Sequence, residues 1–260
     1  YLEHKTMAIT IKSEREIELM AEAGKILERV HNELEKALHP GMSTKDIDTL
    51  GEKIIRSYGC IPSFLNYNGY PASICVSVNQ EVVHGIPDKH RIIHEGDIVS
   101  LDAGVIYKGY HSDAARTHAV GEVSEEAKKL IQVTKECFFE GIKYAKAGNH
   151  LFDISGAIGR YAEERGYGVV RDLCGHGIGT ALHEAPEIPN YEVGRKGVKL
   201  RPGMTLAIEP MINIGTYEVD WLDDDWTVVT RDGSLSAHYE NTILITEGEP
   251  RILSLTCDNE

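Results

Sequence analysis

The spacing of apolar residues predicts two pairs of helices. Ser13-Glu14-Arg15-Glu16 is a capping-box pattern, and after it apolar side chains recur every three or four residues. This pattern predicts a long helix with one buried face. A second helix is predicted from Ser43, and a similar pair covers residues 124 to about 145 and 151 to about 165. The two pairs are therefore well separated along the chain.

Short runs rich in β-branched and other apolar residues lie between and after the helices. They are residues 74–78, 98–105, 206–214, 226–230 and 235–245. Arg231-Asp232-Gly233-Ser234 separates the last two and is typical of a hairpin turn. Helix pairs thus alternate twice with antiparallel strands, so we predict one α+β domain.

The chain partly repeats itself at an offset of 107 residues. The matched positions are Gly41 and Gly148, Gly59 and Gly166, Gly96 and Gly203, and Asp102 and Glu209. Glycine is common, so isolated matches arise by chance, but two local strings also agree, 40–47 with 147–154 and 95–103 with 202–210. We predict a duplicated fold with halves at roughly 10–120 and 121–250 and a site at its pseudo-twofold axis.

Composition limits the protein classes. A chain of 260 residues with 42% hydrophobic content can bury a large core within a single domain, here 7–260. The formal charge of −14 argues against tight nucleic-acid binding, which requires clustered basic residues. No apolar run approaches the roughly 18 residues of a membrane-spanning helix. We expect no membrane association.

Residues 1–6 and the cysteines bear on the cellular compartment. Residues 1–6 match no targeting signal, and we expect them to be a leader left from cloning. The five cysteines form neither an even disulfide set nor a Cys-x-x-Cys zinc pattern, which suits a reducing compartment. We predict a cytoplasmic protein.

Five residues are candidate metal ligands. They are Asp102, Asp113, His176, Glu209 and Glu240. Asp102 and Asp113 flank the turn Lys108-Gly109, so a hairpin would bring the two carboxylates together. A set of oxygen donors with one imidazole suits divalent ions such as Mn²⁺, Fe²⁺ or Co²⁺. A structural zinc site would instead be rich in sulfur ligands. Two such ions sharing carboxylates would lower the pKa of a bridging water and support amide hydrolysis.

The ordered set of motifs resembles the type I methionine aminopeptidases, which have the pita-bread fold. The motifs are His84-Gly85-Ile86-Pro87, Asp102 with Asp113, Cys174-Gly175-His176-Gly177-Ile178-Gly179, His183-Glu184, Ile208-Glu209-Pro210 and Tyr239-Glu240-Asn241-Thr242, and the resemblance covers Met7 to about Thr246. It implies two pseudo-symmetric halves of helix pairs on a curved antiparallel sheet. It also implies removal of the initiator methionine from nascent proteins whose second residue is small.

The resemblance also implies residue roles. Asp102 would chelate one ion, Asp113 and Glu240 would bridge both ions, and His176 with Glu209 would complete the coordination of the second ion. Glu209 would also act as general base and then general acid. His183 would donate to the scissile carbonyl and His84 would lie near the amide nitrogen. The ions would be Co²⁺, Mn²⁺, Fe²⁺ or Zn²⁺.

The resemblance places a methionine pocket and limits the partners. The pocket residues would be Phe64, Tyr67, Tyr70, Cys75 and Trp226. Some family members carry cysteine in place of Phe64 and phenylalanine in place of Leu182, which affects the pocket's shape rather than the reaction. The implied partners are N-terminal methionyl peptides and, transiently, the ribosome. We expect a monomer.

Three alternatives remain open at this stage. A proline-specific peptidase of the same fold usually has an additional N-terminal domain, whereas the first predicted helix begins here at about Ser13. A type II methionine aminopeptidase has an insertion between the equivalents of His176 and Glu209, which are 33 positions apart. A non-catalytic binding protein would tend to lack ligands, and all five are present.

Several other polar residues receive no role. Asp220, Asp223, Asp224 and Asp225 form a dense acidic cluster that we interpret as a solvated loop. His111, two residues before Asp113, is interpreted as structural or as a partner of a ligand. His238 and the remaining histidines have no supporting sequence context.

Overall fold

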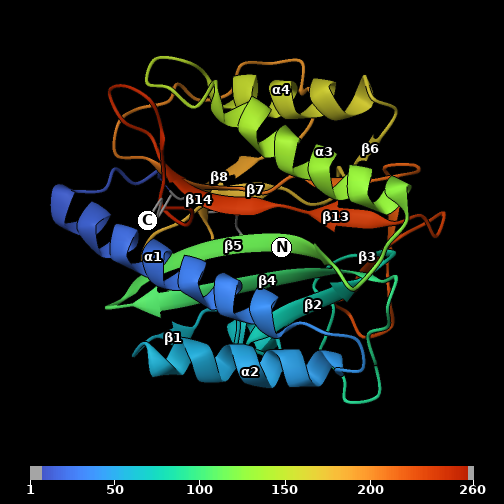
Figure 1. Cartoon of the computed structure of the whole chain (residues 1–260). Helices are drawn as coiled ribbons and strands as arrows, with labels where there is room; N and C mark the ends of the chain where they lie inside the picture. Colours follow the sequence, from blue (N-terminus) through green and yellow to red (C-terminus); the bar gives the residue numbers. More distant parts are fainter. Residues whose placement is uncertain (1–7, 257–260) are drawn as a thin grey trace.

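The computed structural model describes residues 8–256 and contains four α-helices packed on antiparallel sheets (Figure 1). The helices are α1 Glu14–Ala37, α2 Thr44–Ser57, α3 Glu125–Ile142 and α4 Leu151–Glu163, with a 3₁₀ turn, η1, at Tyr67–Gly69. The strands are β1 Ile61–Pro62, β2 Ile74–Val78, β3 Glu81–Val83, β4 Ile98–Tyr107, β5 Tyr110–Ala119, β6 Gly168–Val169, β7 Gly175–Gly177, β8 Glu184–Ile188, β9 Thr205–Ile208, β10 Met211–Asn213, β11 Val219–Trp221, β12 Val228–Thr230, β13 Ser236–His238, β14 Glu240–Leu244 and β15 Arg251–Ile252. The predicted leader at 1–6 lies outside the described residues. The predicted α+β class is confirmed.

The helices begin at side-chain caps. Ser13 and Glu16 form the predicted capping box, in which the Glu16 carboxylate accepts from the Ser13 backbone N–H at 2.7 Å. In α2 the same contact joins the Ser43 N–H to Asp46, and in α4 it joins the His150 N–H to Asp153, each at 2.8 Å. These contacts satisfy donors at the helix start, which fixes where each helix begins.

The main sheet runs in the order β1-β4-β5-β14-β9-β7-β8, with β2 added to β4 and β15 to β14. In Figure 1 α1 and α2 lie on one side of the view and α3 and α4 on the other, and β5 and β14 cross between them. Adjacent β5 and β14 come from different halves of the chain and pair antiparallel. The join between the two halves is therefore continuous sheet.

Two hydrophobic clusters match the two helix pairs. One packs α1 and α2 against β2 and β4 through side chains such as Leu27, Ile47 and Leu101. The other packs α3 and α4 against β9 and β14 through Phe138, Ile154 and Leu206. Each helix pair thus covers its own half of the sheet and leaves the opposite face for other contacts. Within residues 8–256, none of the helices has both the length and the apolar character needed to cross a bilayer.

The glycines matched in sequence have matching backbones. Gly41 and Gly148 both have φ of 94°, Gly59 and Gly166 have 72° and 82°, and Gly96 and Gly203 have 95° and 90°. The Gly41 N–H donates to Ile93 O, and at the same offset the Gly148 N–H donates to Leu200 O. Positive φ is unfavourable for L side chains. The turns are therefore pseudo-symmetric in geometry as well as in sequence.

Alanine at either Gly41 or Gly148 is expected to lower the free energy of unfolding by about 1–2 kcal/mol. No atom lies within 4 Å of the position that the alanine β-carbon would take at either site, so the cost arises from the positive φ alone. Urea unfolding followed by circular dichroism would measure it. Gly248→Ala is the control, because Gly248 is also surrounded by open space and is not among the residues with positive φ. Equal effects of all three changes would contradict the prediction.

Two predicted strands are wrong in extent, and the hairpin predicted at 231–234 is also wrong, because β12 pairs with β11 and β3 whereas β13 pairs with β10. Residues 206–214 form β9 and β10, and 235–245 form β13 and β14. β9 pairs with β14 in the main sheet, whereas β10 pairs with β13 in a separate three-stranded sheet. Pro210 has no N–H for a ladder, and the break comes at Glu209-Pro210 in one strand and at Tyr239 in the other. Both breaks fall beside a candidate ligand.

Candidate metal centre and active site

Strand register brings the acidic candidates to one face of the sheet. Asp102 of β4 and Glu240 of β14 both lie opposite Ala115 of β5. Asp113 lies two residues before Ala115, so its side chain points to the same face. The β4–β5 hairpin predicted from Lys108-Gly109 is present, with Tyr107 opposite Tyr110. Three carboxylates from two halves of the chain therefore converge.

The second half adds Glu209 and His176. Asn241 of β14 pairs with Ile208 of β9, which places Glu240 next to Glu209. His176 lies on β7, which pairs with β9 on its other edge. Alternation along paired strands puts these side chains on the face that carries Asp113. All five predicted ligands thus lie on one face of the sheet.

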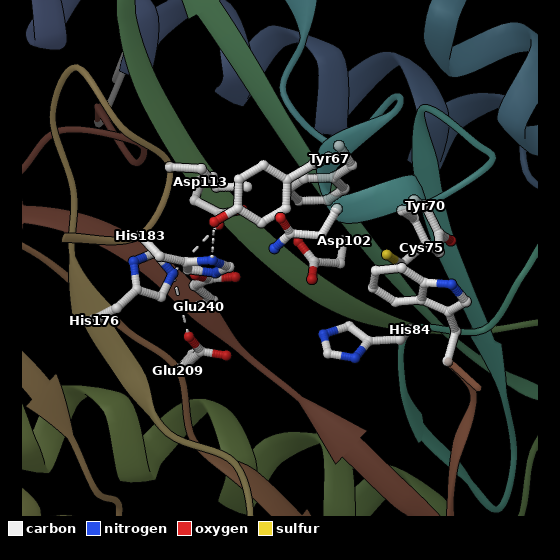
Figure 2. Close-up of a pocket in the computed structure, with 14 residues that line it drawn as sticks. Tyr67, Tyr70, Cys75, His84, Asp102, Asp113, His176, His183, Glu209 and Glu240 are labelled. Atoms are coloured by element: carbon white, nitrogen blue, oxygen red, sulfur yellow. Dashed lines mark hydrogen bonds and ion pairs between the residues drawn. The ribbon is translucent and has the colours of Figure 1, made fainter. Parts of the chain in front are cut away.

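The predicted site residues all line one cavity of about 160 Å³ (Figure 2). Its lining residues are Phe64, Tyr67, Asn68, Tyr70, Cys75, His84, Asp102, Asp113, His176, Leu182, His183, Glu209, Trp226 and Glu240. His176, His183, Asp113, Glu209 and Glu240 group at one end, and Tyr70, Cys75 and His84 lie toward the other. Trp226 contacts Tyr70 and His84 there. The cavity therefore has a polar and an apolar part.

The four carboxyl groups need positive charge. Burial, reinforced by the neighbouring acids, raises the pKa of Asp102, Glu209 and Glu240 well above the usual range, and burial raises that of Asp113 to about 7. Within residues 8–256, imidazoles are the only groups at ion-pair distance from them. Oδ1 of Asp102, Oδ1 of Asp113 and Oε1 of Glu240 are buried without a hydrogen-bond partner. Bound divalent cations would offset the free-energy cost of burying these four acids.

His176 presents a lone pair to the acids. Its Nδ1 lies 2.8 Å from the carbonyl oxygen of Gly177, which can only accept, so Nδ1 carries the proton. Burial lowers the pKa of His176 to about 4, so the ring is neutral at pH 7. Its Nε2 lies 3.6 Å from Asp113 Oδ2 and 3.5 Å from Glu209 Oε1. A neutral nitrogen facing two carboxylates is the arrangement of a metal ligand.

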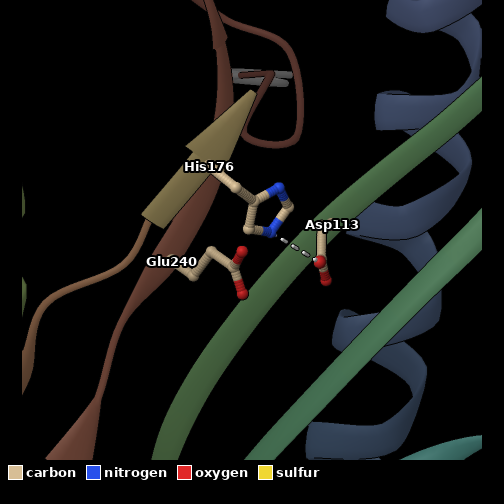
Figure 3. Close-up of side chains that lie close together, drawn as sticks. All are labelled: Asp113, His176 and Glu240. Atoms are coloured by element: carbon tan, nitrogen blue, oxygen red, sulfur yellow. Dashed lines mark ion pairs between the residues drawn. The ribbon is translucent and has the colours of Figure 1, made fainter. Parts of the chain in front are cut away.

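Two overlapping groups of donor atoms fit metal ions. Asp113, His176 and Glu240 form one group (Figure 3), and Glu209, His238 and Glu240 form the other, with donor atoms in each within 4.8 Å of one another. Glu240 belongs to both groups, as a bridging carboxylate would. Oxygen donors dominate both groups, which suits divalent ions. Asp102 belongs to neither group, although it lines the same cavity.

His183 stands at the opening of the cavity. Tyr67 Oη lies 2.8 Å from its Nδ1, and its ring meets that of His176 edge-on with centroids 4.2 Å apart. Desolvation and the nearby imidazoles of His176 and His111 lower the pKa of His183, so its ring is neutral at pH 7. The ring can therefore donate one N–H into the cavity.

His84 and the apolar end lie on the other side. His84 has φ of 59°, rare for a non-glycine residue, and its ring meets Trp226 edge-on at 6.3 Å. Tyr70 contacts Trp226 at 5.1 Å between centroids, and its hydroxyl donates toward Ile74 O and Gly85 O. The Tyr70 ring is thereby fixed as one wall of the apolar end.

Sequence reasoning missed His238. It lies two residues before Glu240, and its Nε2 is 3.6 Å from Glu209 Oε2. The only sequence signal was its position two residues before a candidate ligand. This signal is not specific, because His111 also lies two residues before a candidate ligand, yet it contacts Ser63 and does not line the cavity. The four clustered aspartates are exposed, but Asp220 lies on β11 rather than in a loop as predicted. Among the described cysteines, 60, 75, 137 and 174 are free.

Removing metal is expected to make stability fall as pH rises. An acid whose pKa is raised by folding still holds its proton at a pH where the unfolded chain has released it. The free energy of unfolding therefore falls as pH rises from the unfolded pKa toward the folded pKa. We expect the Tm difference between Mn²⁺-loaded and metal-free protein to widen by at least about 4 °C from pH 6.5 to 8.5. Differential scanning fluorimetry would measure both forms.

The chosen pH window isolates the carboxylates. Histidines with lowered pKa, such as His84 and His176, change the stability only below about pH 6.5, because there the same histidines become protonated in the unfolded chain. The raised pKa of buried thiols, such as Cys75, affects both forms and cancels in the difference. A constant Tm difference across this window would contradict the charge argument.

Comparison with known proteins agrees with this geometry. Residues 18–247 match the model of metallopeptidase family M24. The methionine aminopeptidase of Clostridium acetobutylicum is 59% identical over 247 residues, covering 95% of this chain and 99% of the relative. Methionine aminopeptidase 1 of Bacillus subtilis is 51% identical, covering 92% and 96%.

Solved structures give the same result. The methionine aminopeptidase of Thermotoga maritima superposes with a TM-score of 0.93 at 47% identity, covering 96% of this chain and 100% of that one. The Xaa-Pro dipeptidase of Bacillus anthracis gives a TM-score of 0.75 at 27% identity, and the match spans 62% of its length. These neighbours confirm the predicted pita-bread fold. The chain belongs to metallopeptidase family M24 and, with it, to the enzymes that hydrolyse peptides with the help of divalent metal ions.

Proposed function

We propose that this enzyme removes the N-terminal methionine from peptides and nascent proteins whose second residue is small. The observation that carries the proposal is the cavity, in which four buried acids and the lone pair of His176 adjoin an apolar end. Close relatives named methionine aminopeptidase along nearly the whole chain support it. Asp102, Asp113, His176, Glu209 and Glu240 would hold two ions.

Glu209 is the proposed proton carrier. When bound, the ions would supply a water of lowered pKa and would stabilise negative charge on oxygen. The Glu209 carboxylate accepts the proton of the attacking water and passes it to the leaving amide nitrogen. Its two oxygens lie 3.5 Å from His176 Nε2 and 3.6 Å from His238 Nε2, so the carboxylate stands among the candidate ligands, where the attacking water would be held.

The histidines position the scissile amide. The Tyr67 hydroxyl lies 2.8 Å from Nδ1 of His183. In the proposed arrangement it donates to Nδ1, which leaves the Nε2–H of His183 for the carbonyl oxygen. His84 lies beside Trp226, where it can approach the amide nitrogen. Phe64, Tyr70, Cys75 and Trp226 surround the methionine side chain, and aromatic rings and sulfur make favourable contacts with a thioether.

The test is release of free methionine from Met-Ala-Ser and Met-Lys-Ser peptides. Metal-stripped protein is compared with protein given Mn²⁺ or Co²⁺, and Ala-Pro serves as the substrate of the alternative Xaa-Pro dipeptidase activity. Metal-dependent cleavage of Met-Ala-Ser alone is expected. Cleavage of Ala-Pro instead, or cleavage of no peptide by folded and metal-loaded protein, would refute the proposed activity.

The remaining assignments follow from the same activity. Nascent chains are made in the cytoplasm, so we place the enzyme there, acting as a monomer that meets the ribosome transiently. We also keep 7–260 as one catalytic domain of two repeats. Mn²⁺, Fe²⁺, Co²⁺ and Zn²⁺ all suit donors of this kind.

A further inference from the structure

His238 is a buried imidazole whose Nε2 has no hydrogen-bond partner. The residue is 1% exposed and ends β13, one position before the break at Tyr239. Its Nε2 lies 3.6 Å from Glu209 Oε2 and 4.0 Å from Glu240 Oε2. An unpartnered buried nitrogen costs free energy, so this position calls for an explanation.

The backbone of His238 is held firmly in place. Its N–H donates to Thr117 Oγ1 at 2.9 Å, and the same hydroxyl donates to the carbonyl oxygen of His238 at 2.9 Å. β13 also pairs with β10, where His238 lies opposite Met211. With both backbone groups bound to one threonine of β5, the residue's main chain is fixed relative to the neighbouring sheet.

The two distances are too long for hydrogen bonds but suit a shared ion. Hydrogen bonds between nitrogen and oxygen lie near 2.7–3.2 Å. Two ligand atoms that each bind an ion at about 2.0–2.2 Å lie at most about 4.4 Å apart. Nε2 meets this condition with an oxygen of Glu209 and with an oxygen of Glu240. These three residues form one of the two possible metal-binding groups in the described chain.

The Nε2 atom of the ring faces carboxylate oxygens of both acids and lacks a hydrogen-bond partner. In a neutral imidazole one ring nitrogen carries the proton and the other offers a lone pair, which is what a cation requires. The Arg116 guanidinium donates to the backbone oxygen of Glu240 and to Asn241 Oδ1, so it does not neutralise the Glu240 carboxylate directly.

We propose that His238 is a further ligand of the ion held by Glu209 and Glu240, through Nε2. The proposal rests on the proposed dinuclear site and adds a second imidazole to it. His176 Nε2 lies 3.5 Å from Glu209 Oε1 and His238 Nε2 lies 3.6 Å from Glu209 Oε2, so His238 would be the second imidazole on the ion that His176, Glu209 and Glu240 hold. An added nitrogen favours Co²⁺ and Zn²⁺ over Mn²⁺. The residue would therefore bias which metal the site retains.

The principal variant is His238→Gln, whose amide can donate a hydrogen bond from nearly the Nε2 position but has no imidazole lone pair. The matched control is His118→Gln, because His118 is also a histidine whose buried Nε2 lacks a partner, yet it neighbours Glu35 rather than the candidate ligands. Each full-length protein is stripped of metal and titrated with Co²⁺, Zn²⁺ and Mn²⁺ against a competing chelator. The visible absorption of bound Co²⁺ reports the ligands directly.

We expect His238→Gln to weaken Zn²⁺ and Co²⁺ binding at one of two sites by at least about 10-fold, to weaken Mn²⁺ less, and to change the Co²⁺ spectrum. His118→Gln should bind all three ions as the unaltered protein does. An unchanged Co²⁺ spectrum in His238→Gln, with or without a change in affinity, would overturn the proposal. The role of His238 would then be explained by hydrogen bonding rather than by metal coordination.

A measurement on the unaltered protein covers the case in which His238→Gln does not fold. The imidazoles are labelled with ¹⁵N, and Zn²⁺ is added to saturation while nitrogen shifts are recorded. Metal-bound nitrogens in two histidine rings are expected, and one such ring in a protein that binds two Zn²⁺ would overturn the inference while leaving the dinuclear site in place. Failure to bind two ions at all would count against the dinuclear site as well.

Discussion

Glu209→Gln is expected to lower kcat for Met-Ala-Ser by about 10²–10⁴-fold while the protein remains folded. The amide has nearly the shape of the carboxylate but cannot accept the water's proton. Its oxygen is also a weaker ligand, so metal content must be measured alongside the rate. Methionine release under saturating Mn²⁺, with circular dichroism for the fold, gives both parts of the result.

Glu187→Gln is the matched control for Glu209→Gln. Glu187 lies on β8, opposite His176 in the β7–β8 register, but its side chain is exposed and does not line the catalytic cavity. The same chemical change there should leave kcat within about twofold, because surface substitutions away from special features have small effects. Near-normal turnover by Glu209→Gln with bound metal would remove Glu209 from the mechanism.

The hairpin with Asp102 and Asp113 could be predicted from the sequence because the signals are local. Lys108 and Gly109 both have positive φ, at 46° and 88°, which a tight two-residue turn requires. Once that turn fixes the register, period-two alternation places the two acids on one face. The glycines of the repeat are equally local, since a positive φ selects glycine whatever surrounds it.

The break at Tyr239 and the position of His238 could not be predicted in the same way. An apolar strand from 235 to 245 reads the same whether it stays in one sheet or crosses into another, because both faces are buried there. Pairing of β13 with β10, and of β14 with β5 and β9, is decided by partners far away in sequence. The neighbours of His238 therefore emerge only from the assembled fold.

His183→Ala is expected to lower kcat by about 10²–10³-fold with little change in KM. The ring stands at the opening of the cavity, where its remaining N–H can meet the carbonyl oxygen as that oxygen gains negative charge. A donor of this kind binds the transition state more strongly than the substrate, so its loss appears in the rate. Steady-state kinetics with Met-Ala-Ser separate the two constants.

Tyr67→Phe provides a graded companion to His183→Ala. It removes the hydroxyl 2.8 Å from Nδ1 of His183 and keeps the ring that packs edge-on against that imidazole. The imidazole would remain but could adopt either tautomer, so kcat should fall by less than in His183→Ala and in the same direction. A rise in KM with unchanged kcat in both variants would instead assign His183 to ground-state binding. The paired result thus distinguishes a donor to the transition state from a residue that only lines the cavity.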